Sequence, residues 1–209
     1  MKFKNIIFDL GGVILNIDYD KTITAFKELG ISNFEDLFTQ ARQEDLFNNY
    51  ETGKVPTDLF VNRLLSKMPN HVNESNVVDA WNAMLLDLPM ERLSLLKKIN
   101  SKFNTALLSN TNELHLEAFH HKISVENDIK DLGPYFDKIY FSCDMGMRKP
   151  NTEIFLYVCD EQGYDLTETL FIDDSIQHVE GAKKAGLNAY HLKDKDLCDV
   201  FDKDLNFIG

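Results

Sequence analysis

The stretch Lys4-Asn5-Ile6-Ile7-Phe8-Asp9-Leu10-Gly11-Gly12 decides the fold of this chain. A short run of β-branched and aromatic residues that ends in two glycines predicts a strand buried on both faces, followed by a tight loop. Asp9 then stands at the carboxyl end of that strand. Because open parallel sheets bind ligands at the carboxyl ends of their strands, we expect Asp9 to lie in a ligand site.

The rest of the chain divides into a helical block and a regular alternation of strands and helices. Apolar residues between 17 and 88 repeat with helical spacing, and no strand is indicated there. Beyond this block the predicted helices cover 90–100, 113–119, 152–162 and 176–185, and the predicted strands cover 105–109, 138–142, 169–172 and 188–192. This alternation predicts an α/β fold with a Rossmann-like parallel sheet flanked by helices. We therefore expect a core domain formed by residues 1–15 and 89–209, with an inserted all-helical cap domain over 16–88.

Composition limits the classes of partner. The 209 residues are 44% hydrophobic with 15 Phe, which supports a hydrophobic core and excludes a mainly disordered chain. With 22 Lys+Arg against 34 Asp+Glu, the net charge of −12 disfavours nucleic acid and anionic membranes as partners. The apolar stretch from Ile6 to Leu15 is too short to span a bilayer. Because Cys143, Cys159 and Cys198 are an odd number and lack Cys-x-x-Cys spacing, we expect neither a disulfide framework nor a zinc site. A reducing, cytoplasmic location fits this cysteine content. We expect the protein to be a monomer or a homodimer.

Acidic residues follow the first and fourth predicted strands. A carboxylate at a strand end, such as that of Asp9, can act as a nucleophile and form an acyl phosphate. Asp173 and Asp174 supply the hard oxygen ligands that Mg²⁺ prefers. Single acids at strand ends are more often turn formers or helix caps, so only the conjunction of these residues indicates phosphoryl transfer.

The second and third of these strands carry groups suited to a phosphate. The Ser109 hydroxyl group and the backbone N–H groups of Asn110 and Thr111, at a predicted helix start, can bind phosphate oxygens. Lys149, in the loop after the third of these strands, supplies a positive charge. The glycine pair at 11–12 permits close approach of the backbone to a metal ion and a phosphate group.

In this order, the four segments resemble the motifs of the haloacid dehalogenase-like hydrolase superfamily. The matching segments are residues 6–13, 107–111, 147–150 and 171–175. The wording Phe-Asp-Leu-Gly-Gly-Val, Leu-Ser-Asn-Thr-Asn and Gly-Met-Arg-Lys-Pro is similar, more narrowly, to that of bacterial α-D-glucose-1-phosphate phosphatases. The resemblance implies a Mg²⁺-dependent phosphatase of a small phosphorylated metabolite, such as α-D-glucose 1-phosphate, with a cap that closes over the active site.

The resemblance also implies a role for each matching residue. Asp9 would form the aspartyl-phosphate, and Lys149 would be the catalytic lysine that also binds phosphate. Ser109 and Asn110 would bind the phosphate group of the substrate. The implied Mg²⁺ ligands are Asp9, Gly11, Asp173 and Asp174.

One position departs from the family pattern. Phosphatases of the family usually carry a second Asp two residues after the nucleophile, which protonates the leaving group, and here that position is Gly11. Loss of a positioned acid costs on the order of 10²–10⁴ in rate, and least when the leaving group departs readily. The gap therefore favours sugar 1-phosphates or acyl and aryl phosphates. Asp18 is a candidate substitute acid, the alternative being a polar residue at the entry to the insertion.

Other polar residues give weaker signals. His115, His120 and His121 lack the i, i+4 spacing of two metal ligands on one helix face, so we expect surface histidines. Within the helical block the candidates for substrate contact are Arg42, Tyr50, Glu51 and Lys54, the alternative being a solvated helix end. We expect Trp81 to be a packing residue.

Two other functions stay open. A carbon–halogen hydrolase shares the nucleophile and the fold, but it needs no metal, so the acidic pair Asp173-Asp174 weighs against it. A weakly active or non-catalytic phosphate-binding relative stays open because Gly11 replaces the usual acid.

Overall fold

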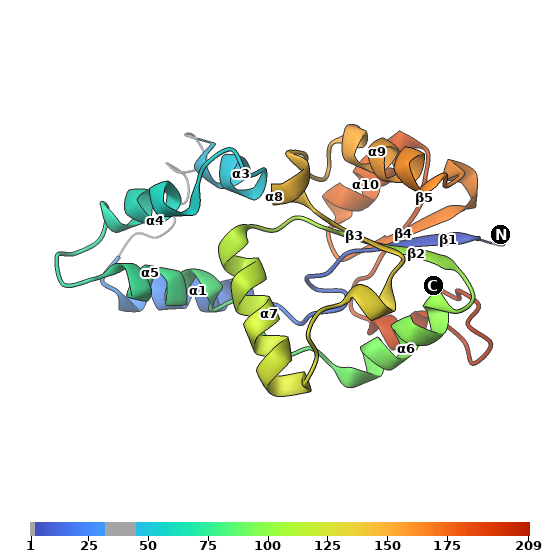
Figure 1. The fold of residues 1–209 in the computed structure, drawn as a ribbon, viewed down its shortest axis with the longest axis horizontal. Coiled ribbons are helices and arrows are strands. Elements are labelled where there is room, and N and C mark those ends of the chain that lie inside the picture. The colour runs from blue at the N-terminus through green and yellow to red at the C-terminus, as the bar shows by residue number, and fades with distance from the viewer. Residues whose placement is uncertain (1–2, 32–44) are drawn as a thin grey trace.

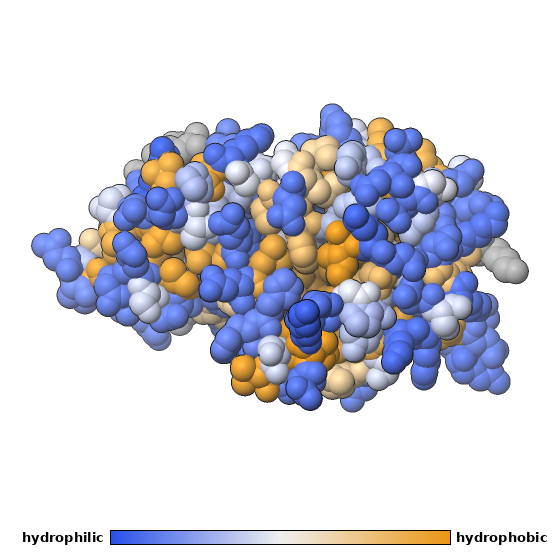
Figure 2. Space-filling view, in the orientation of Figure 1, coloured by the Kyte–Doolittle hydropathy of each residue, from blue (hydrophilic) through white to orange (hydrophobic). Residues whose placement is uncertain are grey.

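The computed structural model describes residues 3–31 and 45–209. Figure 1 shows an elongated molecule in which a lobe of helices lies beside a lobe built on a central sheet. The visible surface is mostly hydrophilic, as the net charge of −12 leads one to expect, and smaller hydrophobic patches lie over the helical lobe and near the junction of the two lobes (Figure 2). None of the helices in the described residues combines the length and apolar character required to cross a membrane. Cys143, Cys159 and Cys198 are free thiols.

The sheet has five parallel strands, as the sequence predicts, in the order β3-β2-β1-β4-β5. Their bounds are Asn5–Phe8 for β1, Asn104–Ser109 for β2, Lys138–Phe141 for β3, Thr169–Asp173 for β4 and Asn188–His191 for β5. The chain moves outward from β1 to β3 and then returns to place β4 on the other side of β1. The crevice at the carboxyl ends of β1 and β4 is therefore the switch point, where sheets of this kind bind ligands. These carboxyl ends point toward the helical lobe (Figure 1).

Alternate residues of β1 supply two separate hydrophobic layers. Ile6 and Phe8 join the cluster that includes side chains of α6 (Met90–Asn100) and α7 (Glu113–Asn127). Ile7 joins the cluster on the other face, which includes side chains of α9 (Thr152–Gln162) and α10 (Ile176–Ala185). All three β1 side chains are at most 1% exposed. A strand buried on both faces explains the continuous apolar run in the sequence.

Three helices around the sheet, α6, α9 and α10, begin and end at the predicted residues. The predicted end of α7 at Phe119 is wrong, because the helix continues to Asn127. Ile123 lies one turn beyond Phe119 and is fully buried, so the buried face of the helix extends through a segment that is polar elsewhere. Ser142, predicted as the last residue of β3, instead begins the short helix α8, Ser142–Met145. Short 3₁₀ helices cover Gly133–Tyr135, Leu166–Glu168 and Leu197–Val200.

The helical lobe has a core of its own. Its described helices are α1 (Tyr19–Glu28), α3 (Leu46–Glu51), α4 (Thr57–Leu65) and α5 (Glu74–Asn82). The ring of Trp81 stacks on that of Phe47 at 5.4 Å and meets Phe60 edge-on at 4.9 Å, which confirms Trp81 as a packing residue. Pro56 is the N-cap of α4. Residues 32–44 of the predicted helical block lie outside the described residues.

Two antiparallel segments connect the lobes. The backbone N–H group of Asn16 donates to the carbonyl oxygen of Asp87, and that of Leu86 donates to the carbonyl oxygen of Asn16, each at 3.0 Å. The N–H group of Asp18 donates to the carbonyl oxygen of Met84 at 2.9 Å. We propose that these paired segments bound the inserted unit predicted over 16–88.

His115 of α7 joins the lobes beside these segments. Its Nε2 lies 3.2 Å from the carbonyl oxygen of Trp81, and its Nδ1 lies 3.1 Å from the Nδ2 of Asn112. The carbonyl oxygen of Trp81 can only accept a hydrogen bond, and the Nδ2 of Asn112 can only donate one. The neutral ring therefore donates from Nε2 and accepts at Nδ1. The ring also stacks on Trp81 at 5.1 Å. His115 is therefore a partly buried junction residue, and the prediction of a surface histidine is wrong for it.

Stability should depend on pH through this histidine. Burial lowers the pKa of His115 from 6.5 to about 4, so between these values the unfolded chain binds a proton that the folded chain does not. Stability should then fall as the pH drops through 6.5, by about 2 kcal/mol between pH 7 and pH 5. Urea unfolding of His115→Gln should lose that part of the pH dependence. The exposed residue on the same helix provides the control His121→Gln, and an unchanged pH dependence in His115→Gln would contradict the assignment.

Candidate active site

A cavity of about 300 Å³ lies where the carboxyl ends of the strands meet the helical lobe. From the sheet-based lobe it is lined by residues that include Asp9, Gly11, Ser109, Asn110, Arg148, Asp174 and His178, and from the helical lobe and its connections by Ile17, Tyr19, Glu51, Met84 and Leu85. The structure thus brings together residues that four separate sequence motifs supply. The volume is at the small end of the range of roughly 300–1,000 Å³ that ligand pockets occupy, so the cavity suits a small molecule.

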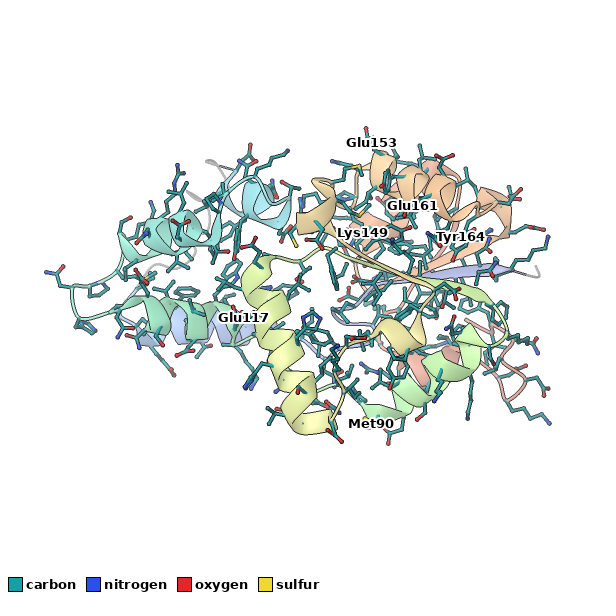
Figure 3. The ribbon with its side chains drawn as sticks, viewed as in Figure 1. Met90, Glu117, Lys149, Glu153, Glu161 and Tyr164 are labelled. Atoms are coloured by element: carbon teal, nitrogen blue, oxygen red, sulfur yellow. The ribbon has the colours of Figure 1, made fainter. Side chains whose placement is uncertain are left out.

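Lys149 lies beneath this cavity with no exposed surface. Its Nζ donates to Asp9 Oδ1 and Asp173 Oδ2 at 2.7 Å each, and to the carbonyl oxygen of Leu108 at 2.9 Å. All three N–H groups of the ammonium are therefore used. In Figure 3, Lys149 lies inside the lobe near the ends of the strands, whereas Glu153 lies at the surface on α9. Lys149 holds one oxygen of Asp9 and leaves the other, Oδ2, available for chemistry.

The carboxyl groups around Lys149 have shifted pKa values. Burial raises the pKa of Asp9, and the charges of Asp173 and Asp174 add to this rise, against the effect of Lys149. Burial and the charge of Asp173 raise the pKa of Asp174 to about 6. Burial also disfavours the charge of Asp173, but Lys149 and His178 outweigh it and hold the pKa of Asp173 below its usual value. Three carboxyl groups against one ammonium leave an excess of negative charge that a divalent cation would neutralise.

A cation would fit between Asp9 and Asp174 better than between Asp9 and Asp173. Asp9, Asp173 and His178 do place potential ligand atoms within 4.8 Å of one another. The ammonium of Lys149 stands between the two carboxylates of that group, however, and would repel a metal ion there. Asp173 also accepts hydrogen bonds from Ser175 N at 2.7 Å and from the His178 ring. Asp174 lines the cavity, and its carboxylate forms no ion pair with a Lys, Arg or His among the described residues, although it interacts with the neighbouring Asp173.

Glycines bring the first loop against this carboxylate. Gly12 has φ +73°, and a Cβ atom placed on it would lie 2.1 Å from Asp174 Oδ2. No other residue type fits that contact and that backbone conformation together. A Cβ atom on Gly11 would instead lie 3.1 Å from Ile17 Cδ1. The side of the loop on which the usual second Asp would project is therefore occupied by an apolar side chain.

The three residues predicted to bind phosphate have different surroundings in the structure. Ser109 lines the cavity. The N–H group of Thr111 donates to Ser142 Oγ at 2.9 Å and is therefore already engaged, while α7 begins at the predicted residue, Glu113. Asn110 lines the cavity, and its side chain also exchanges two hydrogen bonds of 2.9 Å with the backbone of Lys149. Asn110 therefore positions the lysine loop.

The other residues predicted to act on or contact the substrate lie in different parts of the structure. Glu51 lines the cavity. Asp18 does not, because its side chain caps α1 by accepting from Asp20 N. The prediction of substrate contact is wrong for Tyr50, because its side chain lies within the core of the helical lobe and its hydroxyl group bonds Thr57. Lys54 lies on a separate exposed groove. Arg42 lies outside the described residues.

His178 was missed in the sequence. It is the third residue of α10, and its Nδ1 reaches back to both oxygens of Asp173 at 3.0 and 3.1 Å. The available signal was a polar residue in the first helical turn after the acidic pair, where side chains point back toward the preceding strand end.

Comparison with known proteins places these residues in context. A family model described as haloacid dehalogenase-like hydrolase matches residues 3–186. The D-ribitol-5-phosphate phosphatase of Bacteroides thetaiotaomicron is 31% identical over 188 residues, which are 90% of each chain. A crystal structure of a HAD family enzyme from the same organism is 34% identical with a TM-score of 0.88, and the match covers 97% of this chain and 100% of that chain. Another crystal structure of that enzyme, in complex with magnesium and inorganic phosphate, is 35% identical with a TM-score of 0.83 and covers 96% and 100% of the two chains.

Removal of the buried ammonium should destabilise the fold. Lys149→Met leaves Asp9 and Asp173 buried without their partner, and loss of one member of a buried ion pair costs about 3–5 kcal/mol. Urea unfolding near pH 7.5 measures the change. Lys122→Met is the control, because Lys122 forms an exposed ion pair with Glu126 that is worth roughly 0.5 kcal/mol or less. Asp9→Asn with Asp173→Asn in the Lys149→Met background should recover much of the loss. Wild-type stability of Lys149→Met alone would show that the ammonium does not compensate these carboxylates.

Proposed function

The chain belongs to the haloacid dehalogenase-like hydrolase family and is therefore a hydrolase, and we propose that it is a Mg²⁺-dependent phosphatase of a small phosphorylated sugar or sugar alcohol. The observation that carries the proposal is the position of Asp9 on the floor of the cavity, held at one oxygen by Lys149 and beside the unpaired carboxylate of Asp174. The likeness to a D-ribitol-5-phosphate phosphatase, and to an enzyme crystallised with magnesium and inorganic phosphate, supports it.

Asp9 is the proposed nucleophile. Its free Oδ2 attacks the phosphorus atom, the bond from phosphorus to the sugar oxygen breaks, and the sugar leaves as an alkoxide that takes a proton from water. Water then attacks the aspartyl-phosphate, releases inorganic phosphate and restores the carboxylate. Two displacements replace one difficult displacement by solvent.

The surrounding residues bind the phosphate group and hold the nucleophile. The Ser109 hydroxyl group donates to a phosphate oxygen, while Lys149 fixes Asp9 and offsets part of the negative charge of the cluster. Asp9, Asp174 and the carbonyl oxygen of Gly11 would hold Mg²⁺, which supplies charge neutralisation for the phosphate oxygens when bound. Asp173 takes no direct part in this scheme. It positions Lys149, and His178 positions Asp173.

Among the described residues, none of the candidates for the usual second Asp is available as an acid for the leaving group. Gly11 has no side chain, Asp18 caps a helix, and both ring nitrogens of His115 are engaged. The rate should then depend steeply on how readily the leaving oxygen departs without a proton. We therefore expect sugar 1-phosphates, such as α-D-glucose 1-phosphate, to be hydrolysed faster than 6-phosphates of the same sugar.

Removal of the nucleophile tests the proposal directly. Asp9→Asn should lower phosphate release by at least about 10³-fold while the protein stays folded, because an amide oxygen is a poor nucleophile. Asp174→Asn should raise the Mg²⁺ concentration needed for half-maximal activity by about tenfold or more, and EDTA should abolish wild-type activity. Asp160→Asn, an exposed change on α9, is the control. Activity retained in Asp9→Asn would remove it as nucleophile, and activity retained in EDTA would favour the carbon–halogen hydrolase.

A pair of isomeric substrates tests the effect of Gly11. kcat/KM for α-D-glucose 1-phosphate should exceed that for D-glucose 6-phosphate by about tenfold or more, because the anomeric oxygen departs more readily than a primary alkoxide. Gly11→Asp combined with Ile17→Ala, which makes room for the new side chain, should reduce this ratio by improving the slower substrate. A wild-type preference for the 6-phosphate would contradict the argument.

A further inference from the structure

An ion pair crosses the cavity between the two lobes. Glu51 is the last residue of α3 in the helical lobe, and Arg148 directly precedes Lys149 in the sheet-based lobe. Arg148 Nε and Nη2 lie 2.9 and 2.8 Å from Glu51 Oε2. Both residues line the cavity that holds Asp9, and their side chains are 28–29% exposed.

Other contacts hold Glu51 in place. The hydroxyl group of Ser142 donates to the carbonyl oxygen of Glu51 at 2.6 Å. Two residues later, a Cβ atom placed on Gly53 would lie only 2.3 Å from the carbonyl oxygen of Cys143, so the loop after α3 packs closely on α8. The backbone around Glu51 is thus anchored to the sheet-based lobe independently of its side chain. A partly exposed ion pair adds little to such an anchor, since its worth is about 0–1 kcal/mol.

The pair leaves polar atoms unused. Both contacts of Arg148 go to Oε2 of Glu51, so neither Glu51 Oε1 nor Arg148 Nη1 has a hydrogen-bond partner among the described residues. They offer one acceptor and one set of donors on the wall of the cavity. Nearby lining residues Ile17, Met84 and Leu85 are apolar. An occupant that fills this part of the cavity without hydrogen bonds would leave a carboxylate and a guanidinium desolvated and incompletely bonded.

We propose that Glu51 and Arg148 are specificity-determining residues that bind the hydroxyl groups of a polyol leaving group, a statement that rests on the proposed phosphatase function. A hydroxyl group is both donor and acceptor, so neighbouring hydroxyl groups can donate to Glu51 and accept from Arg148. The pair carries no net charge, and it therefore favours neutral hydroxyl groups over a second phosphate group or an amine. Sites built to bond a substrate hydroxyl group strongly reject the analogue that lacks it.

Two alkyl phosphates with the same reacting bond test the pair. D-Ribitol 5-phosphate and n-pentyl phosphate both release a primary alcohol, and only the first carries further hydroxyl groups. Wild-type kcat/KM should favour ribitol phosphate by about 10²-fold or more. Glu51→Gln and Arg148→Met should each lower kcat/KM for ribitol phosphate by about 10- to 100-fold and change that for pentyl phosphate by less than about threefold. Glu153→Gln removes the same charge from an exposed position on α9 outside this cavity, and should change neither substrate.

A purely structural role gives a different result. If the pair only fastened the lobes together, the variants would lower kcat/KM for both substrates equally, which would overturn the proposal, as would equal wild-type activity on the two phosphates. Hydrolysis of 4-nitrophenyl phosphate by the wild type tests the phosphatase function separately. Calorimetric binding to the Asp9→Asn variant tests the pair without turnover. There, Glu51→Gln should weaken binding of ribitol phosphate by about tenfold or more and leave binding of inorganic phosphate unchanged, and equal binding of ribitol phosphate would contradict the assignment.

Discussion

The buried ammonium of Lys149 is the interaction on which the site depends. It joins the carboxyl ends of the two central strands by bonding Asp9 after β1 and Asp173 at the end of β4. Without a positive charge at this point, two buried carboxylates would face each other across the switch point of the sheet. Asn110 holds the backbone of Lys149, and His178 holds Asp173, so residues near the ends of β2 and at the start of α10 support the same contact.

The division of labour between the two acids of the pair follows from this contact. Asp173 is fully buried and its oxygens are used by Lys149, Ser175 and His178. Asp174 turns into the cavity beside Gly12 with a raised pKa and an unpaired carboxylate. Neighbouring residues with the same side chain therefore have different tasks. One organises the protein groups, and the other is free for a cation.

The helical lobe supplies one wall of the cavity, and under the proposed function this wall selects the substrate. An aromatic core around Trp81 packs its helices together, and His115 and the paired connecting segments join it to the sheet-based lobe. Glu51 reaches from this lobe to Arg148, next to the lysine that bonds Asp9, the proposed nucleophile. The proposed binding site for the leaving group thus lies beside the lysine loop, and the two residues that form it, Glu51 and Arg148, are 97 positions apart in the chain.

The sequence by itself determined the parallel sheet, the helical insertion and the segments that carry the chemistry, because apolar periodicity and strand-end residues are local signals. It predicted α9 and α10 to the residue, but it ended α7 at Phe119, since the buried face that continues to Ile123 depends on packing. Only the tertiary structure decided which polar groups are free. Hydrogen-bond partners distant in the chain engage Thr111, Tyr50 and Asp173 and leave Asp174, Glu51 and Arg148 facing the cavity. Such partners are set by how the two lobes and the strand ends meet, which no local pattern of residues records.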